Sequence, residues 1–406
     1  MSAGFIQPRY DSGGFASLPE YITSNLLVEP RKYDALVLIL LDGFGWRFFE
    51  KFQGETFLKH VTRMGHVEKL TTQFPSTTAA HLTTLHTGMP VGEHGIFEWI
   101  YYEPDIDALI APLLFSFAGT AQRDTLKQAS VKPQHLFPQN PFYHALKKKG
   151  VACSILQHRE YTPSSYGDVI FSGARALGYK SLPEVLVNLV ESLAQSGPGD
   201  GKTATSSQAY FVLYNDRIDA ISHEYGPGSL QTSAEIRMLL MTFEKILLKA
   251  WKGNRKRILF MLTADHGQSE VDPQTTIYIN REARFAGIEK YLRRNRKDEL
   301  LVPGGSARDF FLYIQPELVD EAQAFLAPRL EGQAEVRKVA DLMASGWFGP
   351  RLSPSFCQRA GDLVILPYRH ESVWWFEKNK YEMKYFGHHG GLTPQEMEIP
   401  LLTWEM

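Results

Sequence analysis

Three continuous apolar runs constrain the fold of this chain more than any other feature. Their sequences are ALVLILL at 35–41, AYFVLY at 209–214 and RILFMLTA at 257–264. Runs of this kind, rich in branched and aromatic residues, are typical of strands that are buried on both faces of a parallel sheet. Helical patterns separate the runs. This alternation predicts an α/β fold with a mainly parallel central sheet and helices on both faces.

Further segments continue the alternation of helices and strands. They are helices over 46–64 with a break near Gly54, over 182–195 and over 229–252, and strands over 66–72 and 151–156. The first 30 residues contain Gly, Ser and Pro, and they are expected to form an irregular strap on the surface. A polar loop is expected over 196–206.

The pattern changes in the last third of the chain. Two short strand patterns, TTIYIN and FFLYI, precede a helical pattern over 316–330, and the apolar run DLVIL at 362–366 marks a return to the first pattern. We therefore expect a catalytic α/β core made of 1–272 and 360–406. A smaller α+β insertion at 273–359 is expected to form a cap over the active face.

Composition limits the possible partners. The net charge of -2 and the charged fraction of 22% do not favour nucleic acid or an acidic membrane surface as a partner. The basic run RRNRK at 293–297 is interpreted as a solvated surface rather than a phosphate site. No run of about 18 apolar residues and no signal pattern occurs, so a cytoplasmic protein without membrane contact is expected. Two cysteines are too few for a thiolate zinc site.

Six residues of types that bind metals lie at the ends of apolar runs or between glycines. They are Asp42, Asp219, His223, Asp265, His266 and His389. In open α/β sheets, ligands bind beyond the carboxyl ends of the strands, so these side chains are expected to meet there. Asp219 and His223 are four residues apart, a spacing that places both on one face of a helical turn. Carboxylate and imidazole ligands suit zinc, manganese or iron, and their number suits two ions.

A run of hydroxyl residues supplies a candidate nucleophile. Ser76, Thr77 and Thr78 follow Pro75 and begin an apparent helix. At a helix start, unpaired backbone N–H groups and the positive end of the helix dipole favour an anion such as phosphate or sulfate. The alternative interpretation is that Ser76 or Thr77 only caps the helix.

Five motifs extend in order over nearly the whole chain. They are LLDGFGW, FPSTTAAHLTTLHTGMPVGEHGI, YNDRIDAISHEYGP, TADHGQ and GHHGGLTPQEMEIPLL. Through them the chain resembles the alkaline phosphatase superfamily, and within it the type I phosphodiesterase and nucleotide pyrophosphatase family. The resemblance implies an alkaline phosphatase-like fold and a metal-dependent hydrolase that acts on phosphoric esters, including nucleotides as possible substrates.

The resemblance also implies roles for individual residues. One divalent ion, with zinc as the first expectation, is implied to bind Asp219, His223 and His389, and a second to bind Asp42, Asp265, His266 and the nucleophile. Alignment of Thr87 and Gly88 with the family's T-G pair places that nucleophile at Thr78, and Ser76 and Thr77 stay as alternatives. The implied reaction is attack by Thr78 on phosphorus through a phospho-threonine intermediate.

Contacts to the substrate depart from the family pattern. Many members carry an Asn shortly after the H-G-I motif, where it helps to hold the phosphate oxygens, and Trp99 stands at the equivalent position. Trp99 and Tyr101 are expected to line the substrate pocket, with core packing as the equal alternative. Asn215 is a candidate to replace the missing phosphate contact.

Several other functions fit the same residues. A phosphomonoesterase or a phosphonate hydrolase of the superfamily is the alternative among enzymes. A sulfatase fits poorly, because its nucleophile derives from Cys or Ser and neither cysteine lies near Thr78. A binding module that keeps the fold without catalysis is the alternative of another class. The complete set of ligand residues argues against that module, because unpaired buried charges destabilise a protein.

Overall fold

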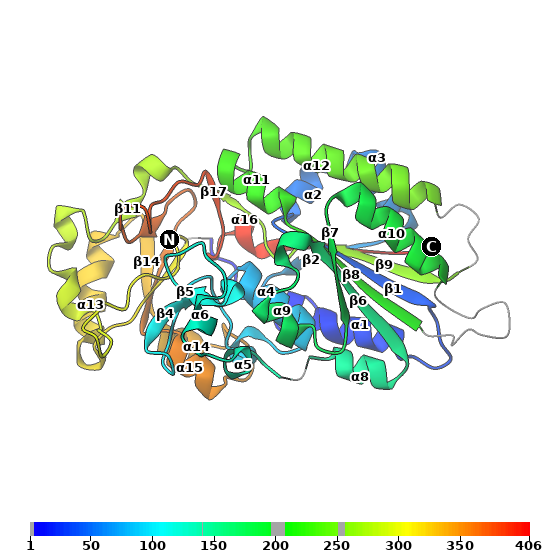
Figure 1. Ribbon diagram of the computed structural model, residues 1–406. Coiled ribbons are helices and arrows are strands. Elements are labelled where there is room, and N and C mark those ends of the chain that lie inside the picture. Colours follow the sequence, from blue (N-terminus) through cyan, green and yellow to red (C-terminus); the bar gives the residue numbers. More distant parts are fainter. Residues whose placement is uncertain (1–3, 140, 196–207, 251–255) are drawn as a thin grey trace.

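The computed structural model describes residues 4–139, 141–195, 208–250 and 256–406. Its centre is a seven-stranded sheet with the order β2-β18-β9-β1-β8-β6-β7 (Figure 1). The strands are β1 (Ala35–Leu41), β2 (Gly65–Thr71), β6 (Val151–His158), β7 (Arg175–Tyr179), β8 (Gln208–Asn215), β9 (Ile258–Thr263) and β18 (Glu398–Glu405). Strands β9, β1, β8, β6 and β7 are parallel, whereas β18 pairs antiparallel with both β9 and β2.

Complete burial explains why the central strands are continuous apolar runs. Every residue of β1, β8 and β9 is buried, so both faces of these strands are covered by helices. One layer contains α2 (Trp46–Phe52), α3 (Thr56–Met64), α10 (Leu182–Gln195), α11 (Arg217–Tyr225) and α12 (Leu230–Phe243). The other contains α1 (Leu18–Leu26), α4 (Thr78–Thr87), α8 (Tyr143–Lys148) and α9 (Ser165–Ile170). The predicted fold class is therefore confirmed.

The expected helices and strands of the core occur with small changes at their ends. The helix expected over 46–64 is divided into α2 and α3 on either side of Gly54. The helix expected over 229–252 is α12, which continues into a π-helical turn at Glu244–Leu248. The polar loop expected over 196–206 lies outside the described residues.

The prediction for the N-terminal segment was wrong. Instead of an irregular strap, the chain forms a 3-10 turn at Phe15–Ser17 and then helix α1. Four apolar side chains, spaced three or four residues apart, are buried against the core; they are Phe15, Leu18, Ile22 and Leu26. This spacing places them on one face of a helix, and Pro19 is tolerated because it lies in the first turn.

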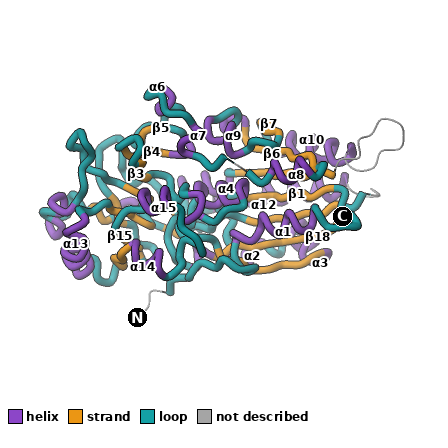
Figure 2. The backbone as a smooth tube through the Cα atoms, turned by 90° about the horizontal axis from the view of Figure 1, so that it is seen from below, coloured by secondary structure: helices purple, strands orange, loops and turns teal. Residues whose placement is uncertain are grey.

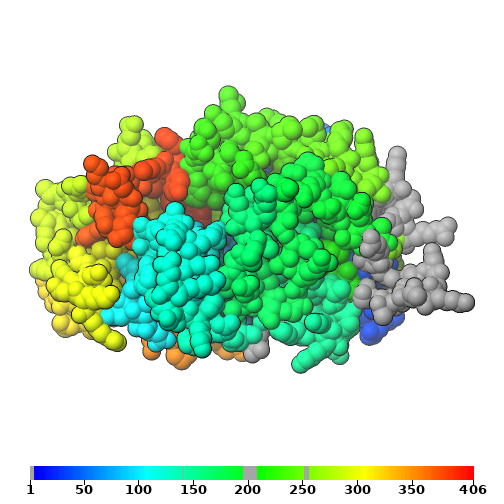
Figure 3. Space-filling view, viewed as in Figure 1, coloured from blue at the N-terminus to red at the C-terminus, as the bar shows by residue number. Residues whose placement is uncertain are grey.

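A second, smaller sheet lies at one end of the molecule (Figure 2). Its order is β12-β13-β15-β14, with β12 (Gly304–Ser306), β13 (Asp309–Leu312), β14 (Ala334–Lys338) and β15 (Leu363–Pro367). Helix α13 (Val319–Leu326) packs on β14, and residues of this part form a hydrophobic cluster of their own. Figure 3 shows orange-red C-terminal segments at the surface between this yellow part and the green helices of the core.

One strand lies elsewhere than expected. The run at 362–366 was assigned to the core, but β15 pairs antiparallel with β13 and β14 in the smaller sheet. Its five residues are all buried, and an apolar run of this kind fits the centre of either sheet. The boundaries of the insertion at 273 and 359 stay a prediction. Within the described residues, no helix has the length and apolar character needed to span a bilayer.

Candidate active site

Three of the predicted ligand residues meet where parallel strands end. Strand β1 lies between β8 and β9, so Asp42, which follows β1, is close to Asp265 and His266, which follow β9. Nε2 of His266 is 3.2 Å from Oδ1 of Asp42 and 3.5 Å from Oδ2 of Asp265. All three side chains are buried. Their ligand atoms lie within 4.8 Å of one another, which is close enough to hold one ion.

A second cluster lies beside the first. Helix α11 places Asp219 and His223 one turn apart, and Oδ2 of Asp219 is 3.2 Å from Nε2 of His223. Nε2 of His389 is 3.7 Å from Oδ1 of the same carboxylate. The His389 ring stacks on the His266 ring with 3.6 Å between centroids, so the two clusters are neighbours.

A glycine permits this close approach. Gly43, directly after Asp42, has φ +73°, and a Cβ there would lie 3.1 Å from Cα of Asp219. A side chain at this position would be strained and would push α11 away from the strand end. The first glycine of the LLDGFGW motif therefore allows the two clusters to be adjacent.

Among the three candidate nucleophiles, the structure places Thr78 at the clusters. Oγ1 of Thr78, the first residue of α4, is 3.1 Å from Nε2 of His266. The Ser76 hydroxyl donates to the carbonyl of Gly391 at 2.8 Å. The Thr77 hydroxyl donates to the carbonyl of Phe97 and accepts the Ala80 N–H as the helix cap. The capping role considered for this segment thus belongs to Thr77.

Three carboxylates and three imidazoles lie close together in the two clusters. Burial raises the pKa of Asp42 well above its ordinary value, and the charges of Asp265 and Asp219 raise it further. Burial also opposes ionisation of Asp219, but contact with His223 lowers its pKa below the ordinary range. The Asp265 and Asp42 carboxylates raise the pKa of His266 to about 10 against the effect of burial. Three carboxylates so close together favour the binding of added positive charge.

The donor set fits divalent cations. Oδ1 of Asp42 and Oδ2 of Asp265 are buried, and neither has a hydrogen-bond partner among the described residues. The other oxygen of Asp265 accepts the backbone N–H groups of Gly43 and His266. Each carboxylate thus directs one unpaired oxygen toward the imidazoles. Oxygen and nitrogen donors without thiolate suit zinc and related ions.

The substrate contacts expected at Tyr101 and Asn215 are not supported. Tyr101 lies in β3 (Tyr101–Glu103) with its ring fully buried, 5.2 Å from that of Phe97, so it is part of the core. Asn215 is also buried, and its amide already donates to the hydroxyl of Tyr179. Trp99 is 46% exposed and is thus free to contact a ligand.

Two residues of the site were not predicted. The Tyr214 hydroxyl donates to Oδ2 of Asp42, and Nε2 of Gln268 donates to Oδ1 of Asp219. Both residues belong to motifs quoted above, Tyr214 as the first residue of YNDRIDAISHEYGP and Gln268 as the last residue of TADHGQ, but the motifs alone do not assign them a contact.

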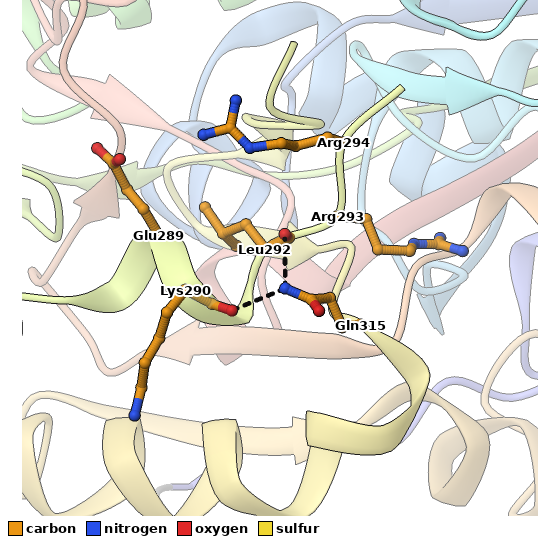
Figure 4. A pocket seen from close by; sticks show the side chains of 6 residues that line it. All are labelled: Glu289, Lys290, Leu292, Arg293, Arg294 and Gln315. Atoms are coloured by element: carbon orange, nitrogen blue, oxygen red, sulfur yellow. Dashed lines mark hydrogen bonds between the residues drawn. The ribbon is translucent and has the colours of Figure 1, made fainter. Parts of the chain in front are cut away.

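A separate cavity of about 600 Å³ lies beside the basic run of the smaller part (Figure 4). The Gln315 amide donates to the carbonyls of Lys290 and Leu292 within it. The arginines of the run have carboxylate partners: Arg293 pairs with Asp362, Arg294 with Asp298 and Arg296 with Asp107. This pairing agrees with the interpretation of the run as a solvated surface.

Solved structures of known proteins share this fold. Murine ectonucleotide pyrophosphatase/phosphodiesterase 5 has 17% sequence identity and a TM-score of 0.64, over 90% of this chain and 87% of that chain. An inactive variant of the murine protein, with one threonine replaced by alanine and in complex with AMP, gives the same values. The human protein has 16% identity and a TM-score of 0.63, over 91% of this chain and 87% of that chain. The comparison with curated protein sequences gave no match.

The sequence itself identifies the family. A profile of the type I phosphodiesterase/nucleotide pyrophosphatase family matches residues 36–392, which include all of the ligand residues described above. The resemblance seen in the five motifs is thereby confirmed. The chain belongs to the type I phosphodiesterase/nucleotide pyrophosphatase family, whose members are hydrolases that act on phosphoric ester bonds.

Proposed function

We propose that the protein is a two-metal phosphodiesterase of the nucleotide pyrophosphatase type, with Thr78 as the nucleophile. One observation carries this proposal: the Thr78 hydroxyl is 3.1 Å from His266, at the start of a helix and beside two adjacent ligand clusters. Thr78 is not needed as a helix cap, because Thr77 already caps the helix.

The residues of each cluster fit the roles that the family resemblance implies. Asp219, His223 and His389 would hold one divalent ion, and Asp42, Asp265, His266 and Thr78 would hold the other. When bound, such ions stabilise the negative charge on the phosphoryl oxygens and lower the pKa of a coordinated hydroxyl. Zinc fits the donor set best, with manganese and iron as alternatives.

Thr78 itself forms and then loses a covalent bond. Its hydroxyl gives up its proton to water, Oγ1 forms a bond to phosphorus, and the leaving oxygen of the substrate departs with the bonding electron pair. Water then attacks the phospho-threonine and restores the hydroxyl as the phosphate product leaves. The amides of Thr78 and Ala79, in the first turn of α4, have no intrahelical acceptor and stabilise the charge that develops on the phosphoryl oxygens.

The relatives support both the nucleophile and the substrate class. The murine protein with a threonine-to-alanine change is described as inactive, and it was solved with AMP. This supports a threonine nucleophile and a nucleotide or similar phosphate ester as substrate. Trp99, with its half-exposed ring, is the residue we propose to contact the substrate.

Replacement of Thr78 tests the proposal. Thr78→Ala should lower kcat for bis-p-nitrophenyl phosphate on the order of 10³-fold or more, because the nucleophile is lost. Its metal content should stay near that of the wild type, because six ligand residues remain. Thr87→Ala, the same change at the other end of α4, is the control and should keep its activity. Turnover by Thr78→Ala close to that of the wild type would refute the nucleophile.

The same assay separates the diesterase from the alternatives. Faster hydrolysis of p-nitrophenyl phosphate than of bis-p-nitrophenyl phosphate would favour the phosphomonoesterase. A phosphonate hydrolase would cleave a phosphonate ester faster than either. A protein that contains both metal ions and hydrolyses none of these esters would support the non-catalytic binding module.

A further inference from the structure

We propose that Tyr214 and Gln268 are positioning residues, each of which fixes one carboxylate ligand of one metal cluster. Tyr214 is assigned to Asp42 in the cluster with Asp265 and His266. Gln268 is assigned to Asp219 in the cluster with His223 and His389. The proposal rests on the ligand assignment of the proposed function, and it concerns metal affinity rather than the chemical step.

Tyr214 selects which oxygen of Asp42 faces the ligands. It lies near the end of β8, in register with Leu40 of the neighbouring strand β1. Its hydroxyl is buried and donates to Oδ2 of Asp42. The other oxygen, Oδ1, is left 3.2 Å from Nε2 of His266 without a hydrogen-bond partner among the described residues. A carboxylate held at one oxygen loses the freedom to rotate, so its second oxygen is fixed toward the cluster.

Gln268 holds the carboxylate of Asp219 from a different segment. The side chain of Gln268 is completely buried, and its Nε2 donates to Oδ1 of Asp219. Arg47 holds the backbone carbonyl of Gln268, which fixes the segment. A Cβ at Gly387 would lie 2.8 Å from Oε1 of Gln268, so the absence of a side chain there makes room for the amide.

Gln268 also links the two clusters. It follows Asp265 and His266 of the first cluster, and its side chain holds Asp219 of the second, to which a nitrogen of His266 also lies within 4.8 Å. The segment after β9 therefore contributes ligands to one cluster and orients a ligand of the other. Partners of this kind typically change metal affinity 10- to 100-fold when they are removed.

Two substitutions test the assignments in the full-length protein. Tyr214→Phe removes the hydroxyl, and Gln268→Met removes the amide at similar length. Metal is first removed with a chelator, and zinc is then titrated against a chromophoric competitor. Each variant should still bind the same number of zinc ions as the wild type. One of its affinities should be weaker by about 10- to 100-fold, and the other should be unchanged.

Crossed backgrounds show which cluster each residue serves. With His223→Ala, which disables one cluster, Tyr214→Phe should still weaken the remaining affinity, whereas Gln268→Met should not. With Asp265→Asn the pattern should reverse. Equal effects of both substitutions in both backgrounds would refute the separate assignments.

Matched controls remove the same groups elsewhere. Tyr210→Phe deletes a buried hydroxyl on the same strand that has no partner among the described residues. Gln208→Met deletes a buried amide that donates to the carbonyl of Tyr33 at 2.9 Å. Both controls should bind zinc like the wild type. If Gln268→Met does not fold, Gln268→Asn, which keeps the amide but shortens its reach, takes its place with the same expectation.

The outcome does not depend on catalysis, because zinc affinity is measured without substrate. Zinc affinities of Tyr214→Phe and Gln268→Met within twofold of the wild type would overturn the positioning roles, even if Thr78→Ala proved inactive. Weaker zinc binding by these two variants would support the roles, even if Thr78→Ala kept its activity.

Discussion

Acid should destabilise this protein through His94, and the structure allows the effect to be calculated. His94 ends α5 (Val91–His94), and its ring is buried. Nδ1 accepts the backbone N–H of Ile96 at 3.0 Å, and Nε2 faces the carbonyl of Ala80 at 3.1 Å. Both ring nitrogens of neutral His94 are thus satisfied, and a second proton would have to sit on Nδ1 against an N–H donor. Burial lowers the pKa of His94 to about 3.

The sign and size of the change in the free energy of unfolding follow from this pKa. The pKa of His94 in the folded protein is lower than the ordinary value of 6.5. Neutral His94 therefore contributes its full stabilisation above pH 6.5, and this contribution is lost as the pH falls toward 3. At pH 5 the unfolded chain binds this proton and the folded chain does not. The pH lies 1.5 units below 6.5, and 1.36 kcal/mol per unit gives a loss of about 2 kcal/mol.

The assay compares the wild type with His94→Asn. The Asn side-chain oxygen replaces Nδ1 as acceptor for Ile96 but does not titrate in this range. Unfolding by urea is followed by circular dichroism at pH 7.5 and pH 5, after removal of metal with a chelator. At pH 7.5 the variant should be less stable by about 1–3 kcal/mol, because the contacts of Nε2 with the Ala80 carbonyl and the Thr84 hydroxyl are lost. At pH 5 this difference should shrink by about 2 kcal/mol.

The same change at an exposed histidine serves as the control. His144 is exposed, and its Nε2 lies 3.0 Å from the Ser172 hydroxyl. His144→Asn is measured at the same two pH values, and a pH-dependent change in stability as large as that of His94→Asn would contradict the role of burial. A difference between wild type and His94→Asn that does not change with pH would refute the reasoning.

Two further predictions concern the ligands and a buried ion pair. Asp265→Asn or His389→Ala should reduce the metal content found by elemental analysis; unchanged stoichiometry in both would remove them from the ligand set. Arg308 is fully buried and contacts both carboxylate oxygens of Glu396 at 3.0 and 2.8 Å. Arg308→Met should lower the free energy of unfolding by about 3–5 kcal/mol, because Glu396 is left as an unpaired buried charge. A loss under about 1 kcal/mol in urea unfolding would contradict this.

The proximity of the proposed ligand residues could be predicted because strand ends are simple to find. Asp42 and Asp265 directly follow apolar runs, and the carboxyl ends of adjacent parallel strands lie at the same edge of a sheet. Asp219 and His223 needed only helical spacing. The hydroxyl segment could not be resolved in the same way, because Ser76, Thr77 and Thr78 are consecutive. Only the contacts of each hydroxyl in the structure separate them.

Burial and hydrogen bonding argue against two of the predicted substrate contacts. Asn215 ends a strand next to the ligands, yet its amide already donates to the hydroxyl of Tyr179. Tyr101 belongs to an aromatic segment close in sequence to the nucleophile, but its ring points into the core. The buried side of α1 was a different failure, because the spacing of Phe15, Leu18 and Ile22 was already visible in the sequence. The Gly, Ser and Pro content of the first 30 residues is a weaker signal than this spacing.

The smaller sheet contacts the segment that carries a proposed metal ligand of the core. On the turn between β12 and β13, the Ser306 hydroxyl donates to the carbonyl of His389 at 3.1 Å. On the same turn, Arg308 holds Glu396, which accepts the Gly391 N–H at 3.0 Å. Both contacts act on the segment that carries His389, so the smaller sheet fixes the position of a proposed ligand of the core. A chain of this family that lost this turn would therefore lose two contacts that support the segment of a proposed metal ligand.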